Sequence, residues 1–80
     1  MIDSRDLEAA ASEFAIKLGQ IIREARLEKG LSQKKLSELS GIQIPNISWW
    51  ENGKVLPSVY SLARVAHALD LELKISFGGE

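Results

Sequence analysis

Three glycines divide the middle of this 80-residue chain into short segments of helical character. Gly30, Gly41 and Gly53 each follow a run in which apolar residues recur every three or four positions. Apolar residues at that spacing lie on one face of an α-helix. Glycine readily takes the left-handed conformation in which many helices end. The pattern therefore predicts one all-α domain, built as a bundle of four or five short helices.

The first two helices can be placed from these signals. The first covers residues 6–29 and contains Gly19, which costs about 1 kcal/mol relative to alanine in a helix. We interpret Gly19 as a point where another helix passes close by. The second helix begins after Ser32, whose hydroxyl can accept a hydrogen bond from a free amide of the first turn. It ends at Gly41.

The next two helices follow in the same way. The third covers Ile44–Asn52, with Gln43 as its N-cap and Pro45 in the first turn, where proline is tolerated. The fourth runs from its N-cap Ser58 to Leu69. We expect the apolar stripes of the four helices, with Ile42 in a turn, to form the core: Phe14, Leu18, Ile21, Ile22, Ala25, Leu36, Leu39, Ile42, Ile47, Trp50, Val59, Leu62, Val65, Ala66 and Leu69.

The period of the apolar residues changes after residue 70. Leu71, Leu73, Ile75 and Phe77 alternate with polar residues, which predicts a short β-strand with one apolar face. A lone strand has unpaired backbone groups. We expect it to pair with the same strand of a second copy, antiparallel across a two-fold axis, in a homodimer. A strand packed on its own helices, or a disordered end, remains an alternative.

Charge is distributed unevenly along the chain, although its net value is only −1. Residues 1–16 contain four acidic residues and one basic residue, whereas residues 17–54 contain seven basic and four acidic ones. A basic segment is typical of a nucleic-acid-binding surface, although solvated surface charges explain it equally well. We therefore divide the chain into an acidic helical extension (1–16), a helical domain (17–70) and a dimerisation strand (71–77).

Several functional classes are disfavoured. The chain has no cysteine, which excludes disulfides and thiolate metal sites. It has no apolar run long enough to cross a bilayer and no signal-peptide pattern, so we expect a cytoplasmic protein. The single histidine, His67, has no partner for catalysis, and we see no glycine-rich phosphate loop. We expect no enzyme, no metal and no cofactor.

Residues 18–73 closely resemble the XRE family, the helix-turn-helix class of phage lambda repressor and Cro. The resemblance is carried by Arg23, Arg26, Gly30-Leu31-Ser32-Gln33, Leu36, Gly41, Ile47-Ser48, Glu51-Asn52-Gly53-Lys54, Pro57-Ser58, Leu62 and Ala68-Leu69. It implies a lambda repressor-like bundle. In that class the second helix of the motif, here Ile44–Asn52, lies in the major groove of double-stranded DNA.

The resemblance also implies which residues meet DNA. The outward early positions of this recognition helix are Gln43, Ile44, Pro45, Asn46 and Trp49. Gln43 and Asn46 can hydrogen-bond to base edges. Ile44 and Pro45 offer only apolar contact, which departs from the more polar family pattern and leaves room for readout of DNA shape.

A second set of residues is expected at the DNA backbone, where contacts fix register but carry no sequence information. It consists of Gln33, Lys34, Asn52 and Lys54. The family equivalent of Gln33 also braces the recognition helix. For each of these residues the alternative is an ordinary exposed polar side chain.

Glu51 is an unexpected residue on a surface that should meet phosphate. In the family this glutamate pairs with an arginine of the first helix, which corresponds to Arg26. We expect a partly buried salt bridge between them. The two adjacent tryptophans should differ, because Trp50 shares a face with Ile47, whereas Trp49 points about 100° away, toward the DNA side.

These features predict a sequence-specific transcriptional repressor that binds a palindromic operator as a homodimer. The ending "ALDLELKISF" also resembles HipB-type antitoxins, and HigA-type antitoxins share the motif. That resemblance implies a cognate toxin as partner and repression of the protein's own operon. The alternatives are a stand-alone phage-like or host regulator and a helix-turn-helix kept as a protein-interaction scaffold.

Overall fold

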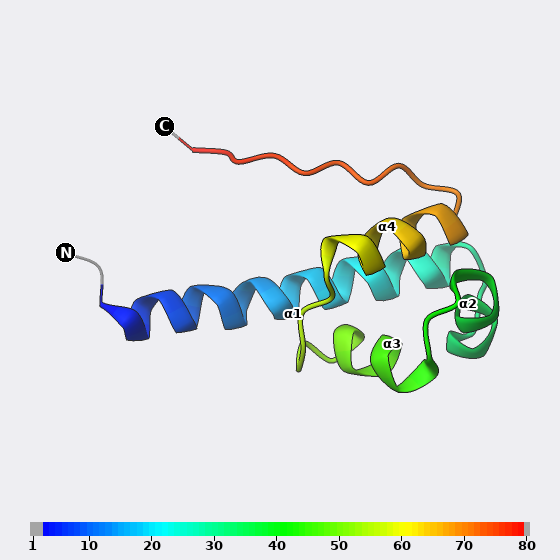
Figure 1. The fold of residues 1–80 in the computed structure, drawn as a ribbon, viewed down its shortest axis with the longest axis horizontal. Helices are drawn as coiled ribbons and strands as arrows, with labels where there is room; N and C mark the ends of the chain where they lie inside the picture. Colours follow the sequence, from blue (N-terminus) through cyan, green and yellow to red (C-terminus); the bar gives the residue numbers. More distant parts are fainter. Residues whose placement is uncertain (1–2, 80) are drawn as a thin grey trace.

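The computed structural model describes residues 3–79 of the chain. Within that range it contains the helices α1 (Ser4–Glu28), α2 (Gln33–Ser40), α3 (Ile44–Glu51) and α4 (Val59–Ala68). In Figure 1, α2, α3 and α4 gather around the C-terminal half of α1, whose N-terminal half extends away from them. The expected all-α class is thus confirmed, with four helices in the described range.

The helices begin and end at residues with clear capping chemistry. The hydroxyl of Ser32 accepts a hydrogen bond from the backbone N–H of Lys35 at 2.9 Å, and that of Ser58 accepts one from Ser61 at 3.0 Å. Gly41 ends α2 in the left-handed conformation, with φ of 74°. Asp70 takes the same conformation after α4, with φ of 58°, and the backbone N–H of Leu71 then bonds to Ala66. This closes the helix as a glycine would.

The core lies where α1, α2, α3 and α4 meet. Leu36 of α2 and Ile47 of α3 are fully buried at its centre. The remaining buried members and the half-buried side chains packed on them come from α1, α3 and α4, from the position after α4 and from the turns on either side of α2: Ile22, Trp50, Val65 and Leu69, with Leu18, Ala25, Leu31, Ile42, Leu62 and Ala68. The expected positions of Ile42 and Trp50 are confirmed.

Four residues expected in the core are instead exposed: Phe14, Ile21, Leu39 and Val59. The reason differs between helices. Phe14 and Ile21 lie on a face of α1 that no other helix of the described chain covers. The buried face of α2 is formed by Leu36 and Ser40. In α4 the buried side chains lie in the later turns, and Val59 is the first residue of that helix.

The expected strand at residues 71–77 is not present in the described single chain. Beyond Leu71 the described backbone makes none of the hydrogen bonds that a ladder requires. The tail instead runs as an extended segment back toward the N-terminal side of the molecule (Figure 1). A strand needs a neighbouring strand to donate to and accept from, and no second strand exists in residues 3–79.

Gly19 allows α1 and α3 to approach closely. A Cβ atom placed on Gly19 would overlap the carbonyl oxygen of Trp50 and would lie 3.0 Å from that of Glu51. These are the last residues of α3, so the crossing of the two helices depends on the missing side chain. The interpretation of Gly19 as a point of close helix approach is confirmed.

We therefore expect Gly19→Ala to destabilise the protein although alanine is the better helix former. Overpacking at a contact with backbone costs about 1–3 kcal/mol, which outweighs the gain of about 1 kcal/mol in helix propensity. Urea denaturation followed by circular dichroism measures the difference. Gln20→Ala, at the exposed neighbouring position, is the control and should change the free energy of unfolding by less than about 0.5 kcal/mol. A more stable Gly19→Ala variant would contradict the close approach.

The described residues offer neither a membrane-spanning helix nor a cluster of metal ligands. No helix in residues 3–79 is both long and apolar enough to span a membrane. No three histidine, aspartate or glutamate side chains in that range are grouped so that they could hold a metal ion.

Candidate nucleic-acid interface

The turn between α2 and α3 is fixed by three separate interactions. The left-handed conformation of Gly41 lets its N–H bond to the carbonyl of Ser37 at 2.9 Å. The N–H of Ile42 then donates to the hydroxyl of the buried Ser40 at 3.2 Å. Ile42 packs on the core beside these residues. Because the turn is tightly held, the angle between α2 and α3 is set by the fold.

Arg64 of α4 supports the same turn, and it was missed in the sequence analysis. Its Nε donates to the carbonyl oxygen of Ser40 at 2.9 Å, and its Nη1 donates to the hydroxyl of Tyr60 at 3.1 Å. The guanidinium also lies over the Tyr60 ring, 5.7 Å from its centroid, an arrangement that favours a cation. The spacing of Tyr60 and Arg64, four residues apart on one helix, is the signal that could have identified the pair.

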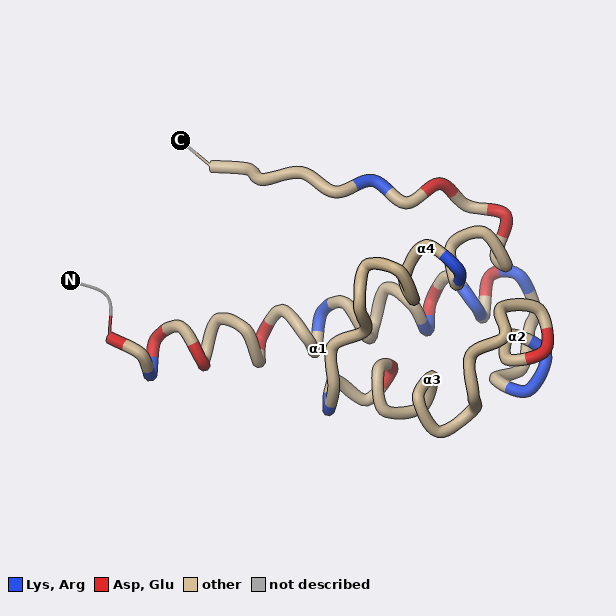
Figure 2. Tube along the Cα trace, in the orientation of Figure 1, with Lys and Arg blue, Asp and Glu red and all other residues tan. Residues whose placement is uncertain are grey.

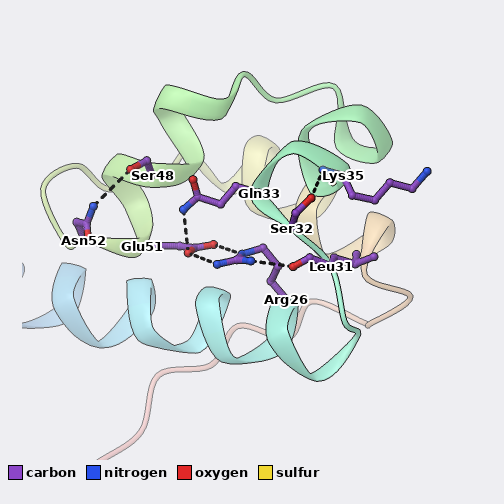
Figure 3. A network of polar contacts seen from close by, with 8 residues as sticks. All are labelled: Arg26, Leu31, Ser32, Gln33, Lys35, Ser48, Glu51 and Asn52. Carbon is purple, nitrogen blue, oxygen red and sulfur yellow. Dashed lines mark hydrogen bonds and ion pairs between the residues drawn. The ribbon is translucent and has the colours of Figure 1, made fainter.

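Arg26 of α1 and Glu51 of α3 form a two-pronged ion pair (Figure 3). Arg26 Nε donates to Glu51 Oε2 at 2.7 Å, and Nη2 donates to Oε1 at 2.9 Å. Both side chains are buried, with 9% and 2% of their surface exposed. The structure thus brings the two expected partners together. It also removes the Glu51 carboxylate from the surface, where it would repel phosphate.

The remaining hydrogen-bonding capacity of this pair is also used. Arg26 Nη1 donates to the carbonyl oxygen of Leu31 at 2.7 Å, and Gln33 Nε2 donates to Glu51 Oε1 at 3.2 Å. No buried side-chain nitrogen or oxygen among the described residues lacks a partner. The pair therefore joins α1, the start of α2 and the end of α3, as Figure 3 shows.

The hydrogen bonds to Glu51 raise the pKa of Arg26, although burial acts in the opposite direction, and the attraction between the two charges adds to the increase. The folded-state pKa is thus raised above an unfolded value that already lies far above neutral pH. The stability that this shift contributes is complete at pH values below the unfolded-state pKa. It is lost only as the pH rises through the folded-state pKa. Arg26 therefore stays positively charged at neutral pH and well above it.

The N-terminal end of α3 presents the residues expected to read bases. Gln43, Ile44, Pro45 and Asn46 are all exposed. Gln43 occupies the N-cap position, but its side chain makes no capping hydrogen bond. The side-chain amide groups of Gln43 and Asn46 make no hydrogen bond to another group of the described chain, so both are available to a ligand.

The two tryptophans of α3 lie on different sides of the helix. Trp50 is 6% exposed and belongs to the core, whereas Trp49 is 46% exposed.

The residues expected at the DNA backbone lie at the start of α2 and directly after α3. Lys34 and Lys54 are exposed and form no ion pair within the described chain. Asn52 is exposed, and its side-chain nitrogen approaches the hydroxyl of Ser48 at 3.4 Å. Gln33 is half-buried because its amide contacts Glu51. Figure 2 shows basic residues on α2 and beside the end of α3, whereas the first half of α1 carries mainly acidic ones.

Comparison with known proteins gives concordant matches. The model of a helix-turn-helix family matches residues 22–75. A 10 kDa protein of the ImmF control region of Bacillus phage phi105 is 37% identical over 59 residues, which are 74% of this chain and 66% of that protein. Multiprotein-bridging factor 1 of Candida albicans is 30% identical over 73 residues, 91% of this chain and 48% of that protein. The chain therefore spans between about half and two thirds of the length of these two relatives.

A solved structure matches as well. The restriction-modification controller protein C.AhdI of Aeromonas hydrophila superposes with a TM-score of 0.74 at 38% sequence identity, over 76% of this chain and 88% of that one. The family match covers α2, α3 and α4, and with them the turn, the ion pair and the exposed end of α3 described above. The chain therefore belongs to the XRE-type helix-turn-helix family.

Proposed function

We propose that this protein is a transcriptional regulator that binds double-stranded DNA through α3 and represses transcription as a homodimer. The observation that carries the proposal is the exposed N-terminal end of α3, held at a fixed angle by the Arg26–Glu51 pair and by the Gly41 turn. A rigid helix with free side chains at its leading end fits the major groove. The similarity to a phage control protein and to a restriction-modification controller supports the same role.

The chemistry of the exposed end suggests a mixed mode of recognition. Gln43 and Asn46 can exchange hydrogen bonds with base edges, and each well-placed contact discriminates by about 1–3 kcal/mol. Ile44 is 41% exposed and can contact thymine methyl groups. With so few polar side chains on α3, DNA shape would supply part of the specificity. Lys34 and Lys54 would neutralise phosphates on either side.

A homodimer would present two recognition helices to a palindrome with half-sites about 34 Å apart. The test is a gel shift with the DNA upstream of the protein's own gene, at several salt concentrations. We expect a complex that weakens steeply with salt, because phosphate contacts release counterions. No complex at low salt would contradict DNA binding and would favour a protein-interaction scaffold, a role that the name of multiprotein-bridging factor 1 also suggests.

Asn46 and Asn52 should respond differently to truncation. Asn46→Ala is expected to relax preference at one base pair, with a loss of about 1–3 kcal/mol on the preferred site. Asn52→Ala should weaken binding to all sequences alike and lower the salt dependence. Titrations of a preferred and a scrambled site measure both effects, with the exposed Gln20→Ala as control. If both asparagine variants lose affinity equally on every site, the division between base and phosphate contacts is wrong.

A toxin partner, and with it an antitoxin role with autoregulation, is a narrower proposal that rests on the resemblance of residues 68–77 to HipB-type antitoxins. The relatives named above are controllers and a bridging factor, which favours the stand-alone regulator. The neighbouring gene decides between these roles. A reading frame for a kinase-like or ribonuclease-like toxin that abuts this gene supports the antitoxin, and co-purification of the two proteins would test it directly.

A further inference from the structure

The N-terminal half of α1 extends beyond the body of the protein. Every described residue from 3 to 14 is exposed, and Ala15 is the first buried one. We call residues 4–14 the arm. Figure 1 shows that no other helix lies beside it. The arm nevertheless carries large apolar side chains, since Leu7 is 57% exposed and Phe14 is 59% exposed. Helical segments of this length gain little stability in water unless an apolar face is packed.

The apolar residues of the arm continue a regular stripe along α1. Its members are spaced alternately four and three residues apart, and we call them the α1 seam: Leu7, Ala11, Phe14, Leu18, Ile21 and Ala25. This is the a/d spacing of a coiled coil, which keeps one row of side chains facing a partner helix. Leu18 and Ala25 pack against the core of the described chain, whereas Leu7, Phe14 and Ile21 do not. Ala11 is exposed too, so four of the six seam residues are uncovered.

The uncovered part of the seam borders an apolar groove. The walls of this groove of about 790 Å³ include Phe14 and Ile21 of α1, Val59 and Leu62 of α4, and Leu73 and Ile75 of the tail. Ile75 and Phe77 are also exposed. The seam and the tail thus contribute to one mainly apolar groove, and Figure 1 shows the tail running back along the molecule toward the arm.

We propose that the arm of a second copy of this chain packs along the α1 seam in antiparallel orientation, so that the two arms form the centre of the homodimer. The a/d spacing of the seam is suited to packing against a second helix. The distribution of charge favours a second copy of this chain that runs antiparallel to the first. Residues 3–13 contain four acidic residues and one basic residue, so parallel arms would repel each other.

The antiparallel orientation relieves this repulsion. It moves each acidic arm toward the part of its partner that carries Lys17 and, at the edge of the groove, Lys74. Lys17 is 69% exposed, and its ammonium group is only loosely paired with Glu13 at 3.6 Å, which leaves it free to meet a second carboxylate. The tail would close the groove over the same interface. This inference rests on the proposed homodimer and specifies the surface that forms it.

The test is sedimentation equilibrium of the full chain without DNA, so that its result does not depend on DNA binding. Phe14→Glu places a charge in the seam, whereas Ala9→Glu adds the same charge to the opposite side of the arm. Neither position is part of the folded body. We expect Phe14→Glu to raise the dimer dissociation constant by more than about tenfold, the equivalent of 1.4 kcal/mol, and Ala9→Glu to raise it by less than about threefold. Circular dichroism checks that both variants stay folded.

Two outcomes would overturn the proposal, and a third separates it from the proposed function. If the unmodified protein is still monomeric at about 100 μM, a second copy does not bind the seam with the affinity usual for such dimers. Equal dissociation constants for the two variants would place the dimer interface elsewhere. A DNA-binding failure in a protein that dimerises as expected would count against the proposed regulator and leave this interface intact.

The orientation can be tested separately because the chain has no cysteine. Ser4→Cys introduces a thiol one step before Leu7 on the seam, near the tip of the arm. In an antiparallel pair the two thiols lie at opposite ends, so mild oxidation should give no more disulfide-linked dimer than Ala9→Cys does. Rapid and complete cross-linking of Ser4→Cys would show that the arms are parallel and would overturn the antiparallel arrangement.

Discussion

Trp50→Ala is expected to leave the protein largely unfolded at 25 °C. Trp50 is 6% exposed and packs in the core with Ile47 and Ile22. Removing a buried tryptophan side chain costs about 3–5 kcal/mol. Globular proteins are stable by about 0.05–0.15 kcal/mol per residue, which is about 4–12 kcal/mol for 80 residues. The loss equals about a quarter to two fifths of the stability at the upper end of this range and all of it at the lower end, where so short a chain is expected because it buries a small share of its surface. Thermal denaturation followed by circular dichroism measures it.

Trp49→Ala is the matched control, because it makes the same chemical change in the same helix. Trp49 is 46% exposed, so its removal should change the free energy of unfolding by less than about 1 kcal/mol. Under the proposed function it should instead weaken the complex with DNA in a gel shift. Equal destabilisation by the two substitutions would contradict the division of roles between neighbouring tryptophans, and unchanged DNA affinity for Trp49→Ala would remove that residue from the interface.

The features that could be predicted from the sequence are those determined by local chemistry. Ser32 and Ser58 cap helices because their hydroxyl groups reach amides three residues later, and this depends only on nearby backbone. Gly41 ends α2 for a similarly local reason. The separation of Trp49 from Trp50 follows from the helical period. The pairing of Arg26 with Glu51 is different, since it joins residues 25 apart and was expected only from the family resemblance.

The features that could not be predicted depend on how much of α1 and of the tail the other helices cover. Phe14 and Ile21 have the spacing of core residues, but α1 is longer than the surface that the other helices offer. Periodicity identifies an apolar face without identifying what covers it. The same holds for Leu71, Leu73, Ile75 and Phe77, whose alternation predicts a strand but does not supply a second strand to pair with. Both exceptions concern the surface on which a second copy is proposed.

In the candidate DNA-binding site, too, local features could be predicted from the sequence and tertiary contacts could not. Which residues of α3 face outward could be read from the sequence, because Ile47 and Trp50 define the inner face. The support beneath the site was harder to predict. Arg64 holds the carbonyl of Ser40 from α4, and Ser48 contacts the side chain of Asn52. The first of these contacts depends on the tertiary fold and the second on a rotamer, so the sequence offered only the four-residue spacings of Tyr60 with Arg64 and of Ser48 with Asn52.

Removing either partner of the Arg26–Glu51 pair is expected to cost about 3–5 kcal/mol, because the other charge is then left buried without compensation. We choose Arg26→Met and Glu51→Leu, which approximately preserve volume. Loss of Glu51 leaves the guanidinium with only the carbonyl of Leu31 at 2.7 Å. Loss of Arg26 leaves the carboxylate with only the amide of Gln33 at 3.2 Å. Urea denaturation of each variant gives the free energy of unfolding.

The double variant separates the pair interaction from the cost of burying its members. Two apolar side chains at these positions need no partners, so Arg26→Met with Glu51→Leu should be more stable than either single variant, as replacement of buried ion pairs by apolar groups often is. For the double variant to be more stable than either single one, the coupling energy must exceed the loss in either single variant, about 3 kcal/mol or more, which is the upper end of the range for residues in direct contact. Additive losses would show that the pair does not act as a unit. Restored stability together with weakened DNA binding would show that the pair serves to set the angle of α3, since only the hydrogen bonds that link α1, α2 and α3 would have been lost.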